Sequence, residues 1–276
     1  MNMAKQSARG LDHIVHAVRD LDAAANFYRK LGFTVGARNR HPWGTHNHIV
    51  QFPGCFIEIL TLAEPDKLGS DGFSRLFGAY NRDFIGRGEG LSLLILESQD
   101  ASADEADFRA AGIAAAEVMR FERDGKRPDG SAVKLGFSLA FAEDKDAPDI
   151  HFAVCQQHYP ENFWNPAFQR HANGVEGISG VVAVAAAPDQ HRPFLEAFAG
   201  ERAAGNDDGF SIATPRGTID MLTPAAFVRR FGAAAPDVSR GARLAALRFV
   251  STGRDKATVI GPNDAMGAVL VLEPGR

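Results

Sequence analysis

The beginning of the chain follows a pattern of one strand, one helix and three further strands. Residues 11–18 are apolar and β-branched, as in a buried strand. Asp20 is a good helix N-cap, and apolar residues then recur at helical spacing until Gly32, a residue suited to a helix end. The Pro53-Gly54 pair predicts a tight turn between two later strands. Strands are expected over 11–18, 33–39, 45–52 and 55–62.

The same order of elements returns along the chain. The spacing from Leu11 to Gly32 equals that from Leu91 to Gly112, at an offset of 80 residues. A second copy is predicted with strands at 90–98, 134–141 and 150–157 and a helix at 102–111. A third has strands at 178–187, 209–214 and 217–222 and a helix at 189–199, and a fourth, without a helix, has strands at 243–250, 256–260 and 267–274. Such repetition predicts an α+β fold of βαβββ modules.

Two segments do not fit the repeat. Residues 158–177 are polar and aromatic and contain an Asn-Gly turn, so they predict a connector between pairs of modules. Residues 64–89 are rich in glycine, with a short helix expected around 73–77. The predicted organisation is an N-terminal domain at 9–157, the connector, and a C-terminal domain at 178–276.

Composition narrows the functional classes. The 276 residues are 45% apolar and 23% charged, with a net charge of −4 and no basic run, so neither nucleic acid nor an acidic membrane surface is an expected partner. The apolar runs are too short to cross a bilayer, and the first ten residues have no apolar core, so we expect no secretory signal. The two cysteines fit buried free thiols in a cytoplasmic protein.

The opening segment LDHIVHAVRDLDAAANFYRKLGF and the later segment RHPWGTHNHIVQFPGCFIEIL carry a resemblance to a known group of proteins. The chain resembles the vicinal oxygen chelate superfamily, which includes glyoxalase I, methylmalonyl-CoA epimerase, extradiol dioxygenases and fosfomycin-resistance proteins, and in particular its glyoxalase-like members. The resemblance is strongest over 10–63, weaker over 90–157, and weakest beyond 177. It implies two domains of paired modules, each a cupped, eight-stranded mixed sheet flanked by helices.

A carboxylate within an apolar strand is the first candidate for chemistry. Glu58 lies between Ile57 and Ile59, so it must face water, a cation or a metal. The resemblance implies that His13 and Glu58, on the first and last strands of module one, are metal ligands. An imidazole and a carboxylate suit a divalent metal such as Zn, Mn, Fe or Ni. The alternatives are an exposed glutamate and a hydrogen-bonded core histidine.

Module two departs from the ligand pattern. Leu93, or Ser92 if the register shifts by one residue, replaces His13, and neither supplies an imidazole. His151 is the candidate third ligand by analogy with Glu58. If the other face of strand 150–157 points inward, Gln156 and His158 face the cup instead. In the C-terminal domain, Asp220 matches Glu58 but has no imidazole partner, so we expect no metal there.

Further polar and aromatic residues are expected around the cup. His46 and His48 share one face of strand 45–52 and are predicted to contact the substrate, or, for His48, to act as a general base. A solvated hairpin edge is the alternative. Trp43 is predicted to form the mouth of the cup. Gln156, His158 and Trp164 are predicted to form its rim or lid, unless they only pack a linker.

Three functions are compatible with these residues. The first is a metal-dependent lyase or isomerase that chelates a small oxygenated substrate and stabilises an enolate, with Glu58 or His48 moving the proton. With Fe(II), the same ligands suggest an extradiol-type dioxygenase. The third is a protein that binds a small molecule without catalysis. A homodimer is the expected assembly. The sequence contains no GxSxG, P-loop, GxGxxG, CxxC or HExxH motif.

Overall fold

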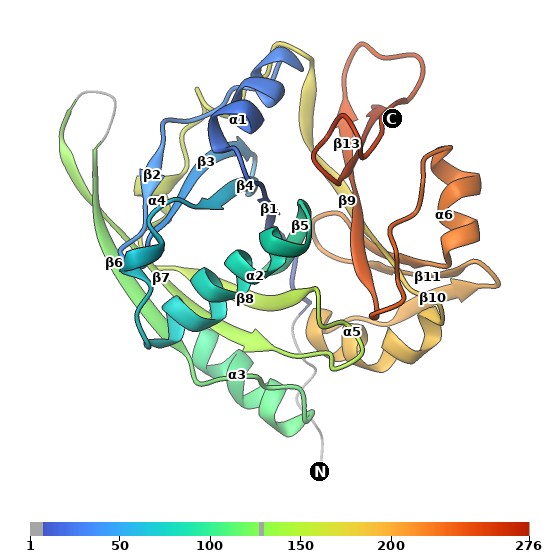
Figure 1. Ribbon diagram of the computed structural model, residues 1–276, viewed down its shortest axis with the longest axis horizontal. Helices are drawn as coiled ribbons and strands as arrows, with labels where there is room; N and C mark the ends of the chain where they lie inside the picture. Colours follow the sequence, from blue (N-terminus) through green and yellow to red (C-terminus); the bar gives the residue numbers. More distant parts are fainter. Residues whose placement is uncertain (1–7, 127–129, 276) are drawn as a thin grey trace.

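The computed structural model describes residues 8–126 and 130–275 and contains two curled sheets flanked by helices (Figure 1). The first sheet has eight strands. Their spatial order is β2 (Asn39–Arg40), β3 (Thr45–Phe52), β4 (Cys55–Leu62), β1 (Leu11–Ala17), β5 (Gly90–Glu97), β8 (His151–Gln157), β7 (Ala132–Ala142) and β6 (Met119–Lys126).

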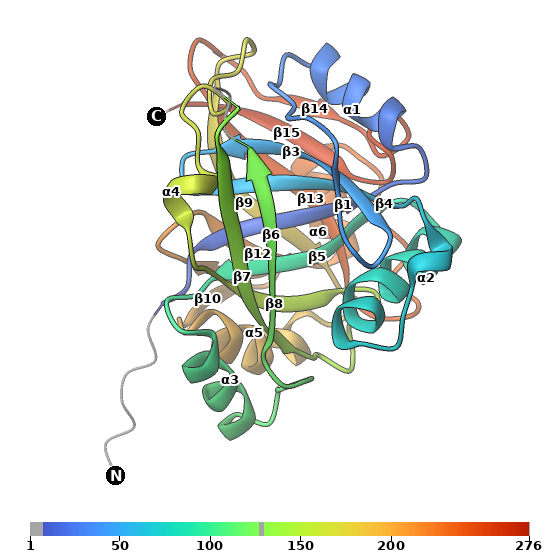
Figure 2. The same cartoon turned by 90° about the vertical axis from the view of Figure 1, so that its left-hand side faces the viewer.

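The two N-terminal modules meet along their first strands. β1 pairs in parallel with β4 and antiparallel with β5, and β5 pairs in parallel with β8. Each module therefore contributes four strands to one continuous sheet, which curls around its inner face (Figure 2). The helices α1 (Leu21–Lys30) and α3 (Ala101–Ala110) follow the first strand of their module, and Asp20 and Asp100 cap them as N-cap acceptors.

The second sheet has seven strands. Their order is β10 (Ala203–Asn206), β11 (Gly209–Ala213), β12 (Thr218–Leu222), β9 (Val175–Val184), β13 (Arg243–Ser251), β15 (Val269–Pro274) and β14 (Thr258–Ile260). The helix of the third module is α5 (Arg192–Ala199), preceded by a helical turn at Pro188–His191. The eight strands expected here are reduced to seven because the fourth module passes from β13 to the three-residue β14 through a short turn.

The two sheets pack back to back and share one core. Apolar residues from the outer faces of both sheets join with the helices between them, among them Ile57, Phe152, Val181 and Leu247. Three fully buried aromatic residues of α1, α3 and α5 complete it: Tyr28, Phe108 and Phe198. His16 lies in this core, hydrogen-bonded to Tyr28 and to the carbonyl oxygen of Met266, as the alternation along β1 predicts. The α+β fold is thus confirmed.

The inner faces of the two sheets differ. On the second sheet, α6 (Pro224–Phe231) lies across the strands, where Phe227 and Phe231 pack against Val182 and Val271. On the first sheet, the inner face is bordered by α2 (Tyr80–Arg87), which follows a helical turn at Ser74–Ala79, and by the short α4 (Pro160–Phe163). A second turn, at Pro65–Lys67, follows β4.

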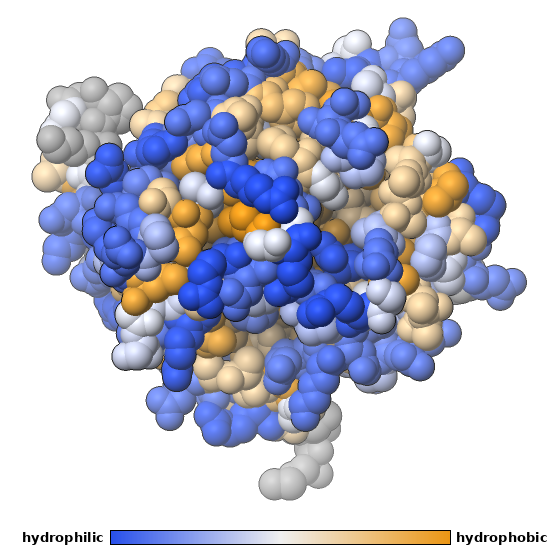
Figure 3. Space-filling model, in the orientation of Figure 1, coloured by the Kyte–Doolittle hydropathy of each residue, from blue (hydrophilic) through white to orange (hydrophobic). Residues whose placement is uncertain are grey.

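Most large apolar side chains are inside the molecule. Among the described residues only Phe168, Val228 and Val259 are large, apolar and exposed, and on the face of Figure 3 hydrophilic residues surround smaller apolar areas. Both cysteines, Cys55 and Cys155, are buried and free. No helix in the described part of the chain has the length and apolar character needed to cross a bilayer.

Thr223→Ala is expected to lower the free energy of unfolding by about 1 kcal/mol. The Thr223 hydroxyl accepts a hydrogen bond from the backbone N–H of Ala226 at 3.2 Å, which satisfies the first turn of α6. Urea unfolding of the two proteins measures the difference. Thr223→Ser keeps the hydroxyl and should unfold near the wild-type midpoint, so an equal loss in both variants would contradict a capping role.

Candidate functional site

The inner face of the first sheet surrounds a cavity with an empty volume of about 510 Å³, part of which is open to solvent. Strand alternation directs His13 of β1 and Phe56 and Glu58 of β4 to this face, while their neighbours Ile14 and Ile57 enter the shared core. Because β1 and β4 are adjacent and parallel, with Val15 opposite Glu58, the imidazole and the carboxyl group lie next to each other.

The ring of His13 is held from behind. Its Nδ1 donates a hydrogen bond to Asp12 at 2.5 Å, and the ring stacks on Phe56 with the centroids 4.2 Å apart. The side-chain amide of Gln157 donates to the other oxygen of Asp12 at 3.1 Å. With its Nδ1 proton committed to Asp12, a neutral His13 presents the lone pair of Nε2, which lies 4.0 Å from Glu58 Oε2.

Glu58 is buried and hydrogen-bonded on one side. The amide of Asn47 donates to Oε1, and Nε2 of His41 lies 3.9 Å from that same oxygen. Burial raises the pKa of Glu58 above the usual value of 4.5, while His13, Asn47 and the positive charge of Arg123 oppose this rise. A carboxyl group with a raised pKa exchanges protons closer to neutral pH than an exposed glutamate does.

The segment before β3 forms one wall of the cavity. Nδ1 of His41 is hydrogen-bonded to the Thr45 hydroxyl at 2.8 Å. Burial lowers the pKa of His41 to about 3, so its imidazole is neutral near pH 7. Trp43 stacks on His41 at 4.6 Å. Gly44 has a φ of +89°, and a Cβ there would lie 2.1 Å from the carbonyl oxygen of Glu64, so only glycine fits this turn.

Aromatic side chains and one cation complete the lining. The rings come from three different parts of the chain: Phe73, Phe77, Phe121, Phe137 and Phe163. Arg123 of β6 also lines the cavity. It makes no hydrogen bond or ion pair with any described residue. Its charge opposes the rise that burial causes in the pKa of Glu58, and it adds to the lowering that burial causes in the pKa of His41.

Three of the predicted site residues line the cavity, namely His13, Trp43 and Glu58. The two histidines of β3 lie elsewhere. His46 pairs with Glu64 at 2.8 Å, and His48 bonds to the carbonyl oxygen of Gly36 at 2.8 Å. Asn47 and Ile49, which alternate with them along β3, line the cavity instead.

His151 is not brought together with His13 and Glu58. Its Nδ1 bonds to the carbonyl oxygen of Leu76 at 2.9 Å and its ring stacks on Tyr80 at 3.4 Å, beyond the lining of the cavity. Burial lowers its pKa to about 4. The strand pairing shows which residues of module two correspond to the predicted ligands. Leu93 pairs with His151 as His13 pairs with Phe56, so His151 corresponds to Phe56. The residue that corresponds to Glu58, two positions further along the strand, is Ala153.

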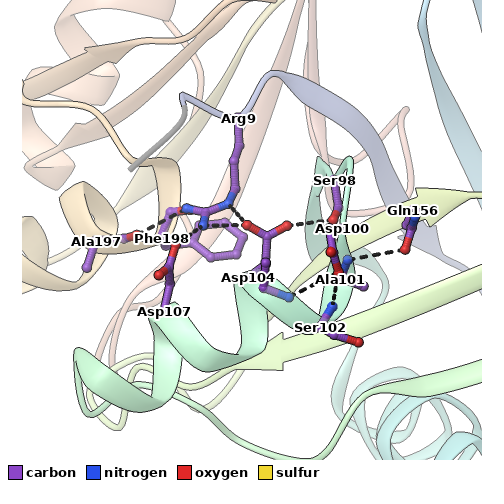
Figure 4. Close-up of polar contacts among 11 residues, drawn as sticks. Arg9, Ser98, Asp100, Ala101, Ser102, Asp104, Asp107, Gln156, Ala197 and Phe198 are labelled. Atoms are coloured by element: carbon purple, nitrogen blue, oxygen red, sulfur yellow. Dashed lines mark hydrogen bonds and ion pairs between the residues drawn. The ribbon is translucent and has the colours of Figure 1, made fainter. Parts of the chain in front are cut away.

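The predicted rim residues also lie outside the cavity lining. Gln156 accepts a hydrogen bond from the backbone N–H of Ala101 at 3.2 Å at the start of α3 (Figure 4). His158 bonds to the Ser138 hydroxyl at 2.8 Å. Trp164 packs against Phe163, with the ring centroids 4.9 Å apart, and it is Phe163 that lines the cavity.

The second sheet has a different polar group at the equivalent place. Asp220 lies opposite Val182 as Glu58 lies opposite Val15, so the predicted match in position holds. Its carboxylate pairs with Arg230 at 3.0 Å and with Arg248 at 3.1 Å. The residue at the place of His13 is Gly180, and Arg248 occupies the space beside it.

The residues present do not make a complete metal site. Of the predicted ligands only His13 and Glu58 share the cavity, and module two offers Leu93 and Ala153 at the matching places. His13 lies beside Oε2 of Glu58, whereas His41 lies beside Oε1. Within residues 8–126 and 130–275, no group of three or more His, Cys, Asp or Glu side chains is arranged to hold a metal ion.

Glu58→Gln should become more stable relative to the wild type as pH rises above about 4.5. Burial raises the pKa of Glu58 in the folded state, so between the two pKa values the folded protein holds a proton that the unfolded chain has lost. The contribution of Glu58 to wild-type stability is therefore fully present below pH 4.5 and is lost as pH rises through the folded pKa. Urea unfolding across this range measures the difference; a constant difference between the two proteins would contradict the raised pKa.

Comparisons with known proteins give one family and several similar structures. A family model described as a glyoxalase-like domain matches residues 11–198. A hypothetical protein from Staphylococcus aureus aligns with a TM-score of 0.71 and 14% identity over 96% of this chain and 99% of that one. A mutant 4-hydroxymandelate synthase from Streptomyces coelicolor aligns with a TM-score of 0.54 and 12% identity over 89% of this chain and 71% of that one. No curated protein matches the sequence.

Proposed function

Because the chain belongs to the glyoxalase-like domain family, we propose that its first cup is the active site of an enzyme that moves a proton on a small oxygenated substrate, as an isomerase or a lyase. The family match confirms the resemblance to the vicinal oxygen chelate superfamily, and the two structural neighbours share the fold. Neither the fold nor the family fixes the reaction, so the proposal rests on the residues of the cavity.

The observation that supports it is the convergence of Glu58 and an oriented His13 inside an aromatic cavity. His13 Nε2 lies 4.0 Å from Glu58 Oε2, and Asp12 fixes the imidazole from behind at 2.5 Å. Two titratable groups facing one cavity, each held by a second residue, are the arrangement that general acid–base catalysis requires.

The reaction follows from these positions. The Glu58 carboxylate takes a proton from the carbon next to a substrate carbonyl, and the electron pair of that C–H bond moves to the carbonyl oxygen. The charge of Arg123 stabilises the resulting enolate. Return of a proton to the same carbon on its opposite face, from protonated His13, gives the epimer. In an α-hydroxycarbonyl substrate the hydroxyl proton passes to the former carbonyl oxygen, and return of the proton from Glu58 to the former carbonyl carbon gives the isomer. A leaving group on the carbon beyond the deprotonated one departs with its bonding electron pair while the carbonyl group re-forms, which gives the lyase product.

A metal-dependent reaction is the second candidate. Asp12 holds His13 as carboxylates commonly hold metal-binding histidines, which favours a divalent ion such as Zn, Mn, Fe or Ni on His13 and Glu58. The chain supplies two ligands at that place instead of the three expected with His151. The extradiol-type alternative needs the same incomplete site.

Solvent deuterium incorporation tests the proposal. The protein is incubated in D₂O with single-ring and aliphatic 2-oxo acids, hydroxyketones and aldehydes, and the loss of the C–H signal is followed by proton NMR. We expect at least one class to exchange faster with protein than without it. A compound that binds in the cavity and never exchanges would instead support the non-catalytic binding protein.

A further inference from the structure

The aromatic side chains that line the cavity of the first sheet pack against one another. Trp43 stacks on Phe73 with the centroids 4.8 Å apart and an angle of 7° between the planes. Phe121 meets Trp43 edge-on at 5.2 Å and stacks on Phe137 at 5.4 Å. Offset and edge-on contacts of this kind suit a planar ring better than a saturated one of the same size.

Two donors on these walls have no partner. Trp43 is only 6% exposed, and its indole Nε1 is buried without a hydrogen bond to any described residue. The guanidinium group of Arg123 likewise makes no hydrogen bond or ion pair within the described residues. Buried donors are nearly always paired in folded proteins, so the unpaired Nε1 of Trp43 is unusual. Arg123 is only partly buried, and a guanidinium group that pairs with no described residue beside a cavity is available to an anionic ligand.

The acidic groups nearby leave Arg123 available. Asp12 is engaged by His13 and by Gln157, and Glu58 accepts from Asn47 between the two imidazoles. Among the described residues that line the cavity, Arg123 is therefore a cation without a hydrogen-bonded carboxylate. A carboxylate offers the two acceptor oxygens and the negative charge that a guanidinium group binds best.

We propose that the cavity selects planar aromatic anions, with a carboxylate or similar group on Arg123 and the ring against Phe73, Phe121 and Phe137. As a statement about substrate this rests on the proposed function, whereas the binding preference stands on the cavity alone.

Tryptophan fluorescence tests the preference in the full chain. The protein has two tryptophans, so Trp164→Phe leaves Trp43 as the single reporter on the cavity wall. Phenylacetate, its neutral amide phenylacetamide and the saturated cyclohexylacetate are titrated in turn. We expect phenylacetate to bind about tenfold or more tightly than either of the other two.

Variants of the arginine complete the test. In the Trp164→Phe background, Arg123→Gln should remove the advantage of phenylacetate over its amide, and Arg123→Lys should keep part of it. Arg120→Gln is the matched control, because Arg120 is exposed on the same strand and pairs with Glu122. Circular dichroism establishes that the variants are folded.

The outcomes separate this inference from the proposed function. Equal binding of the three probes, no quenching by phenylacetate at millimolar concentration, or equal effects of the Arg123 and Arg120 variants would overturn the inference. Tight, Arg123-dependent binding of aromatic anions without any deuterium exchange would support the inference and contradict the enzyme. Deuterium exchange confined to neutral aliphatic compounds would support the enzyme and contradict the preference for aromatic anions.

Discussion

Glu58→Gln is expected to slow solvent deuterium incorporation by about 100-fold or more, because a glutamine side chain cannot take up the substrate proton. Its carbonyl oxygen can still accept the hydrogen bond from Asn47, so the shape of the cavity and the binding of a ligand should persist. The exchange rate measured by NMR, and ligand binding measured by Trp43 fluorescence, report the two properties separately.

The matched control is Glu64→Gln. Glu64 is a partly exposed carboxylate that pairs with His46 at 2.8 Å outside the lining of the cavity. Its replacement should leave the exchange rate near the wild-type value. If Glu58→Gln retained the full rate while still binding the ligand, Glu58 would not be the base, and the acid–base account of the cup would be wrong.

Arg9→Ala is expected to lower the free energy of unfolding by about 3–5 kcal/mol. Arg9 is 2% exposed and precedes β1. Its Nε donates to Asp104 of α3 at 2.7 Å, and its Nη1 donates to the carbonyl oxygen of Phe198 at the end of α5 at 3.0 Å (Figure 4). One side chain thus joins a helix of the first pair of modules to a helix of the second, and its removal leaves the Asp104 carboxylate buried without its cation.

Urea unfolding followed by circular dichroism measures this loss. Arg109→Ala is the control, since Arg109 lies on the same helix α3 and pairs with Glu105 while remaining 67% exposed. An exposed pair of this kind contributes roughly 0.5 kcal/mol or less. A similar small change in both variants would show that the buried ion pair does not hold the two halves together.

The fold was predictable from the sequence where elements repeat. The strand and helix from Leu11 to Gly32 recur at an offset of 80 residues, and this spacing together with the order of the elements indicated the first two modules. The site was predictable where a polar residue interrupts an apolar strand. Glu58 stands between two isoleucines, and its neighbours Ile57 and Ile59 enter the core as the alternation requires.

Other parts of the site carry no such signal. β6 reads MRFERDGK, a mostly charged segment in which the apolar alternation ends after Phe121, so neither the strand nor Arg123 was expected. In β3, the histidines suggested that the face with His46 and His48 belongs to the site. The strand pairing places Ile49 opposite Glu58, so Ile49 and Asn47 share the face that lines the cavity. In module two, the helical segment from Ser74 to Arg87 covers His151, a contact between segments far apart in the sequence.

The most direct test of the account is deuterium exchange by the metal-stripped protein. The protein is dialysed against a chelator, its metal content is measured, and the exchange rate is then recorded alone and with added Zn, Mn, Ni or Fe(II). We predict that exchange persists without metal and does not rise when metal is added, because Glu58, His13 and Arg123 supply the chemistry. Exchange that disappears on stripping, returns with one metal, and is lost again in His13→Ala together with stoichiometric metal binding would contradict it.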